Sequence, residues 1–101
     1  MDRRQPWLKW YPSDWRADPG LRMCGWAARG LWIDMLGLMH EAEPYGHLVV
    51  NGHAPTPKQL ATLLGGGTAR EVERLLAELE QAGVFSRGSD GVIYSRRMVR
   101  D

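Results

Sequence analysis

The residues of this 101-residue chain that could do chemistry are chiefly arginines and tryptophans. Eleven of its thirteen cationic side chains are arginine, whose planar guanidinium group suits phosphate or carboxylate better than the point charge of lysine. In the first 16 residues, tryptophans are interleaved with basic residues, a pattern that can stack unpaired bases. Large aromatic side chains more often fill the core of a small domain, so we expect Trp10, Trp15 and Trp32 to be buried. Trp7 and Trp26 are candidates for a partner or self-association surface.

No catalytic or metal-binding pattern is recognisable in the sequence. The three histidines (His40, His47 and His53) lack metal-ligand spacing, and Cys24 is the single cysteine. The glycines of residues 65–67 precede a predicted helix, but the lysine of a phosphate-binding loop is missing. We therefore predict a non-catalytic protein with no cofactor and no metal.

Composition and length indicate one folded domain. Hydrophobic residues make up 44% of the chain and charged residues 25%, which excludes wholesale disorder. No apolar run approaches the roughly 20 residues of a membrane helix, and no apolar segment of a signal peptide follows the charged N-terminus. A single cysteine fits a reducing compartment. We expect a soluble cytoplasmic domain that does not use a membrane.

The formal net charge of +1 conceals an uneven distribution of charge. Residues 1–33 carry +3, residues 34–83 carry −4 and residues 84–101 carry +2. A nucleic-acid-binding domain usually has a strong basic excess, so binding here would depend on a local patch. The alternative is that two basic ends simply neutralise an acidic middle.

Helical periodicity begins at Trp26 and is stopped by Pro44. One predicted buried stripe consists of Ala28, Leu31, Trp32, Met35, Leu36 and Met39. Gly30 and Gly37 weaken this helix by roughly 1 kcal/mol each relative to alanine, which is tolerable if another element packs closely there. Residues 46–50 are predicted to form a short strand.

Two helix starts and a hairpin follow. Thr56 and Gln59, and then Thr68 and Glu71, have the spacing of capping boxes. The first helix ends at the glycines of residues 65–67, and the second runs over residues 69–82 and ends at Gly83. Strands at 84–86 and 92–94 flank a turn that contains Asp-Gly, a strong hairpin signal.

The order of these elements is that of a winged helix, an α+β fold in which a helix-turn-helix unit is followed by a β-hairpin wing. We predict a three-helix core with a small antiparallel sheet, in which the 46–50 strand pairs with the hairpin. The expected core joins the leucines of the two short helices to the long helix: Leu60, Leu63, Leu75, Leu76 and Leu79 meet Leu31, Trp32 and Met35, closed by Phe85, Ile93 and Val49. The domain would span residues 20–95. Residues 1–19, with Pro6, Pro12 and Pro19, would form an extended aromatic and basic arm, and residues 96–101 a basic tail that leads into a further C-terminal region.

Four motifs in order resemble the N-terminal winged-helix domain of phage and prophage replication-initiation (replisome-organiser) proteins. They are Trp10-Tyr11-Pro12-Ser13-Asp14-Trp15, Ala28-Arg29-Gly30-Leu31-Trp32, Gly46-His47-Leu48 and the Leu-Ala-x-Leu-Leu-Gly segment of residues 60–65. The resemblance covers roughly residues 8–95. It implies a DNA-binding or origin-recognition domain of DNA replication, often followed by a region that contacts the host helicase machinery.

The predicted DNA-binding residues lie on the second helix of the helix-turn-helix unit, which enters the major groove in such folds, and on the wing and tail. They are Thr68, Arg70, Arg74, Arg87, Arg96 and Arg97. Four glutamates share that helix and would repel phosphate. Two hypotheses follow: a domain that binds duplex DNA weakly by itself, or the same fold acting as a protein-interaction or dimerisation module without DNA contact. Possible partners are DNA, a second copy, or another replication protein.

Overall fold

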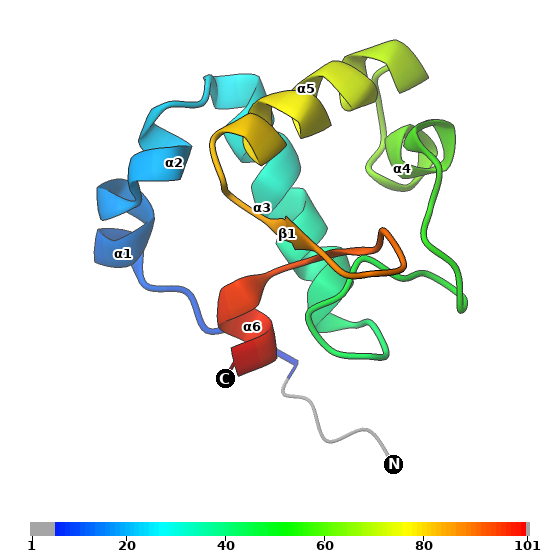
Figure 1. Cartoon of the computed structure of the whole chain (residues 1–101), viewed down its shortest axis with the longest axis horizontal. Helices are drawn as coiled ribbons and strands as arrows, with labels where there is room; N and C mark the ends of the chain where they lie inside the picture. Colours follow the sequence, from blue (N-terminus) through cyan, green and yellow to red (C-terminus); the bar gives the residue numbers. More distant parts are fainter. Residues whose placement is uncertain (1–5, 101) are drawn as a thin grey trace.

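The computed structural model describes residues 6–100, which form a small α+β fold (Figure 1). Within these residues six helices and one two-stranded antiparallel sheet follow in order: α1 (Pro12–Ala17), α2 (Pro19–Arg22), α3 (Trp26–His40), α4 (Pro57–Leu63), α5 (Ala69–Gln81), β1 (Ser86–Arg87), β2 (Ile93–Tyr94) and α6 (Arg96–Arg100). The long helix, the pair of helices and the hairpin occur in the predicted order, which is compatible with a winged helix. Across the described part of the chain, no helix is long and apolar enough to cross a membrane.

Helix α3 forms the centre of the molecule and buries five of the six residues of the predicted stripe, while Leu36 is partly buried. Ala28, Met35 and Met39 are fully inaccessible to solvent, and Trp32 stacks on Phe85 with ring centroids 6.1 Å apart. The helix ends at His40, before Pro44, because the chain already turns at Glu41. In Figure 1, α5 crosses one end of α3 and the hairpin lies in front of its middle.

The turn between α4 and α5 forms as its sequence predicts. Both capping boxes are present: Thr56 accepts from the Gln59 N–H at 3.2 Å, and Thr68 from the Glu71 N–H at 3.1 Å. Gly65 and Gly67 both have φ of +82°, a left-handed conformation that costs a side-chain-bearing residue free energy. The two helices therefore stay separate and pack against each other.

The predicted sheet is only partly formed. Strands β1 and β2 pair with Ser86 opposite Tyr94. Residues 46–50 join them through a single bridge between His47 and Tyr94, supported by the Leu48 N–H donating to the Ile93 carbonyl at 2.8 Å. Leu48 faces the core, so Val49 points the other way, as side chains of extended backbone alternate.

Three predictions about the core are wrong. Leu63 is 46% exposed because the inward face of the short α4 is made by Leu60, Ala61 and the partly buried Leu64. Val49 is outside the core for the reason just given, and Leu48 takes its place. Trp10 is 45% exposed; it lies ahead of α1 and contacts Trp15, which is itself only partly buried.

The N-terminal segment is not an extended arm throughout. Tyr11 and Asp18 are extended, as residues before proline usually are. Pro12 and Pro19, however, each stand at the first position of a helix, where the missing N–H is no loss. The Asp18 carboxylate caps α2 by accepting from the Leu21 N–H at 3.1 Å.

The predicted basic tail is also structured. Residues 96–100 form helix α6, and Met98 is buried against the core. Gly46 allows the close approach of this helix, because a Cβ there would lie 3.0 Å from both Met98 and Val99. Residues 1–5 and 101, which belong to the predicted arm and tail, lie outside the described residues.

Candidate nucleic-acid interface

The outer face of α5 carries the two arginines that most directly resemble a DNA contact. Arg70 and Arg74 are exposed and one helical turn apart in the N-terminal half of the helix. Within residues 6–100 neither side chain forms an ion pair. Both guanidinium groups therefore lie in solvent beside the glycine turn.

Three of the four glutamates on α5 form hydrogen bonds or an ion pair with other residues of the domain. Glu71 completes the capping box by accepting from the Thr68 N–H at 3.2 Å. Glu78 accepts from the Gly25 N–H at 2.6 Å and so caps the start of α3. Glu80 pairs with Arg87. Within the described chain Glu73 alone of the four has no hydrogen bond, although Glu71 and Glu80 are exposed as well.

Thr68 is engaged as the N-cap of α5. Its hydroxyl oxygen accepts from the Glu71 N–H, and its own N–H donates to the Glu71 carboxylate. The backbone N–H groups of Ala69 and Arg70 are the ones left at this helix start for a phosphate. A phosphate there would lie close to the Glu71 carboxylate, which disfavours its binding.

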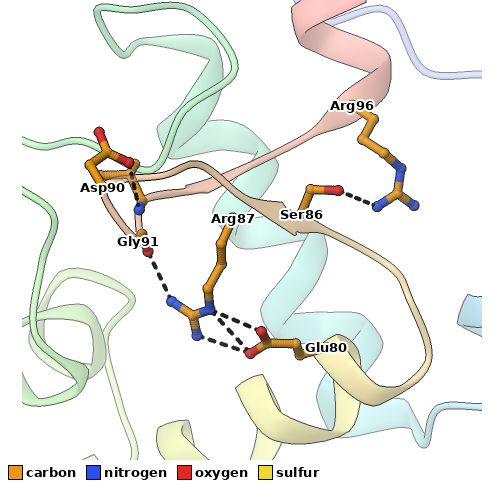
Figure 2. A network of polar contacts seen from close by, with 7 residues as sticks. Glu80, Ser86, Arg87, Asp90, Gly91 and Arg96 are labelled. Atoms are coloured by element: carbon orange, nitrogen blue, oxygen red, sulfur yellow. Dashed lines mark hydrogen bonds and ion pairs between the residues drawn. The ribbon is translucent and has the colours of Figure 1, made fainter.

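Arg87 is held against α5 and the hairpin turn. Figure 2 shows its guanidinium group donating to the Glu80 carboxylate, at 3.0 Å from Nε, and to the Gly91 carbonyl at 3.1 Å. The Asp90 carboxylate accepts from the Val92 N–H and closes the same turn. Insertion of Arg87 into a minor groove would require these contacts to break.

Arg96 and Arg97 connect α6 to the rest of the domain. Arg96 donates to the Ser86 hydroxyl at 2.8 Å (Figure 2) and to the carbonyl of Gly83, which follows α5. Arg97 pairs with Asp14 of α1 at 2.6 Å and lies over the Tyr11 ring, 5.0 Å from its centroid. The structure thus does not bring the six predicted DNA-binding residues into one group; it separates Arg70 and Arg74 from three arginines that hold elements together.

The two tryptophans assigned to a partner surface are both exposed. Trp7 is 54% exposed and precedes the first helix. Trp26 is 85% exposed at the first position of α3, next to Met23, which is 78% exposed. The connection between α2 and α3 therefore carries two exposed apolar side chains.

Neither a metal site nor a reactive thiol is found among the described residues. Among residues 6–100 no group of three or more histidine, cysteine, aspartate or glutamate side chains could hold a metal ion. Burial raises the pKa of the Cys24 thiol, and the nearby Glu78 carboxylate raises it further. Such a thiol is a poor nucleophile because little of it ionises.

One group of residues was missed by sequence reasoning. Trp10, Tyr11 and Arg100 line a cavity of about 570 Å³ between the N-terminal segment, α3 and α6. The interleaved tryptophans and basic residues included Trp10, which was expected in the core; Tyr11 was not part of that pattern, and Arg100 joins the group only because α6 folds back. Comparison of the chain with protein-family models, curated proteins and solved structures finds no match.

Proposed function

We propose that this chain is a non-catalytic, winged-helix DNA-binding domain of the phage replication-initiation type, and that α5 is its recognition helix. The observation that carries the proposal is the division of charge on α5. Three of its glutamates are occupied by the cap, by Gly25 and by Arg87, whereas Arg70 and Arg74 extend into solvent. Arg70 and Arg74 are therefore the cationic side chains of α5 that a phosphate can reach without breaking an ion pair among residues 6–100.

The proposal assigns DNA contact chiefly to Arg70 and Arg74. Arg87, Arg96 and Arg97 act through the fold, because each is bound to another element. Two outward arginines and a net charge of +1 give few phosphate contacts, so a single domain binds duplex DNA weakly and with a shallow dependence on salt.

Fluorescence anisotropy of a labelled duplex at low salt tests this function. The double variant Arg70→Ala/Arg74→Ala should weaken binding and reduce the magnitude of the slope of log K against log salt by about 2. The matched control is Arg16→Ala/Arg22→Ala, which removes the same charge from exposed positions of α1 and α2. Absence of binding at low salt, or equal loss in both double variants, rejects the proposal.

The outer face of α3 favours dimerisation as a second candidate function. Trp26, Gly30, Ile33 and Gly37 recur at spacings of four, three and four, which places them on one side of the helix. Trp26 and Ile33 are exposed, and nothing in the described chain lies within 4 Å of a Cβ added to either glycine. In an antiparallel pair related by a two-fold axis, each large residue would face a glycine of the other copy.

This pattern is self-complementary, as an isologous interface must be. One short helix face buries less than the roughly 800 Å² per partner of a standard interface, so the expected dimer is weak. Sedimentation velocity over a range of concentrations should show self-association that Trp26→Ser abolishes and Trp7→Ser leaves intact. A wild-type protein that stays monomeric at the highest concentrations excludes this function.

A further inference from the structure

The cavity between the N-terminal segment and α6 is lined by both aromatic and cationic side chains. Its lining includes exposed aromatic rings, with Trp10 45% and Tyr11 48% exposed, and a base of buried side chains that includes Trp32 and Met98. Four cationic residues also line it: Lys9, Arg96, Arg97 and Arg100. At about 570 Å³ the cavity is within the usual range for a small-ligand site.

The charge of this cavity is positive after its internal pairs are accounted for. It contains two carboxylates, and both have partners: Asp18 caps α2, and Asp14 binds Arg97. Arg96 is held by Ser86 and Gly83. Lys9 and Arg100 are exposed and stand at the cavity with no carboxylate bound to them among residues 6–100, so an anion could be bound there without first breaking an ion pair.

The two exposed rings, Trp10 and Tyr11, differ in how far neighbouring side chains cover their faces. The guanidinium group of Arg97 covers the Tyr11 ring at 5.0 Å. Trp10 contacts Trp15 at an angle of 58°, with centroids 5.9 Å apart, so this contact is tilted and does not cover a ring face by stacking. The Trp10 indole is therefore the surface on which a planar ligand can stack.

We propose that this cavity binds a nucleotide of single-stranded nucleic acid, with its base stacked on Trp10 and its phosphate held by Lys9 and Arg100. An aromatic face next to cationic side chains is the combination that single-strand-binding proteins use, and it tolerates any base sequence. A base-paired duplex cannot present a free base face to the ring. The site is distinct from the duplex-binding surface, because Arg70 and Arg74 lie in the half of α5 that adjoins α4, and α1 and α4 lie on opposite sides of the molecule (Figure 1).

Anisotropy of a fluorescein-labelled, short oligothymidylate at low salt provides the test. Trp10→Ala and Arg100→Gln should each weaken binding about tenfold. Arg100→Gln should also flatten the salt dependence, whereas Trp10→Ala should leave the salt slope unchanged, because stacking releases no counterions. Trp10→Phe keeps a ring and should retain most of the affinity, which separates stacking from misfolding.

Two matched controls accompany these variants. Met23→Ala removes an exposed apolar side chain elsewhere, and Arg22→Gln removes an exposed arginine of α2; neither should change the affinity. An abasic oligonucleotide of the same length should bind more weakly than oligothymidylate. Equal binding of the abasic strand, or equal losses in the control variants, overturns the proposal.

The single-strand site and the duplex-binding function fail separately. Arg70→Ala/Arg74→Ala should weaken duplex binding and leave oligothymidylate binding intact. An acidic peptide that contains one aromatic residue is the competing ligand for a basic, aromatic cavity. The nucleotide proposal is wrong if oligothymidylate does not bind at all. If, in addition, the peptide binds to the wild-type protein but not to Trp10→Ala, the cavity is a peptide site.

Discussion

At the scale of single residues, the arginines of this chain divide into those that hold the fold and those that face solvent. Arg96 donates to the carbonyl of Gly83, just beyond the end of α5, where the helix dipole favours a cation. Arg87 forms an ion pair with Glu80 in which both side chains are more than 40% exposed. Water and salt screen such an exposed pair, so it contributes little to stability.

We therefore expect Arg96→Ala to destabilise the fold more than Glu80→Ala does, because the latter removes only the exposed ion pair with Arg87. Loss of the charged hydrogen bonds to Ser86 and Gly83 should cost about 1–2 kcal/mol, against less than about 1 kcal/mol for the Glu80 pair. Urea denaturation followed by circular dichroism measures both values. Similar values for the two variants would show that the contact between α6 and the end of α5 contributes no more than an exposed ion pair does.

Cys24 gives the domain a pH dependence of known sign. Burial and Glu78 raise the pKa of its thiol in the folded state, so the unfolded thiol loses its proton at a lower pH than the folded one. The free energy of unfolding should be highest below the unfolded pKa and should fall as the pH rises through the folded pKa. Denaturation at several alkaline pH values should show a steeper decline for wild type than for Cys24→Ala. Parallel curves would contradict this prediction.

At the scale of elements, the sequence predicted those helix ends and turns that depend on residues close together in the chain. The two capping boxes, the left-handed Gly83 and the hairpin turn each depend on residues a few positions apart, and all formed as expected. The rule that the residue before proline is extended also held at Tyr11 and Asp18. The inference from that rule to a continuous arm failed, because a proline that ends one segment can begin a helix.

Features that depend on distant contacts were not predictable in this way. Five residues of α6 would not form a stable helix alone. They are held by Met98 in the core, by Arg97 on Asp14 and by close contact with Gly46. No local pattern in residues 96–100 specifies those partners, and the same absence of a local signal hid the cavity to which Arg100 contributes.

Gly30 and Gly37 lower the stability of α3 without a visible packing reason in the described chain. The close packing that would explain them is not found within residues 6–100, since a Cβ at either position meets nothing within 4 Å. Alanine at each position should therefore stabilise the domain by about 1 kcal/mol. Gly46→Ala is the contrasting variant: its φ of +79° and the 3.0 Å approach of Met98 predict a loss of at least about 1 kcal/mol. Thermal unfolding of the three variants measures these changes, and a destabilising Gly30→Ala or Gly37→Ala would contradict the prediction.

At the scale of the whole molecule, the proposed single-strand site lies between the N-terminal segment and α6. Helices α1 and α6 are joined there by the ion pair between Arg97 and Asp14. The helix-turn-helix pair occupies another side (Figure 1), and the longest dimension of the described chain is 37 Å. A domain with a duplex-binding surface and a single-strand site on different sides is suited to DNA that contains a junction between duplex and single strand.

A duplex with a single-stranded tail should therefore bind more tightly than either the blunt duplex or the isolated strand. When α5 holds the duplex, the tail is presented to the Trp10 cavity at a high effective concentration, so the two weak affinities combine. The gain should be absent for tails too short to reach around the molecule and should appear once the tail spans its 37 Å length. Competition anisotropy with a series of tail lengths measures this dependence. In Trp10→Ala, every tailed duplex should bind with only the affinity of the blunt duplex. If tailed and blunt duplexes bind equally at all lengths in the wild-type protein, the two sites do not act together on one DNA molecule.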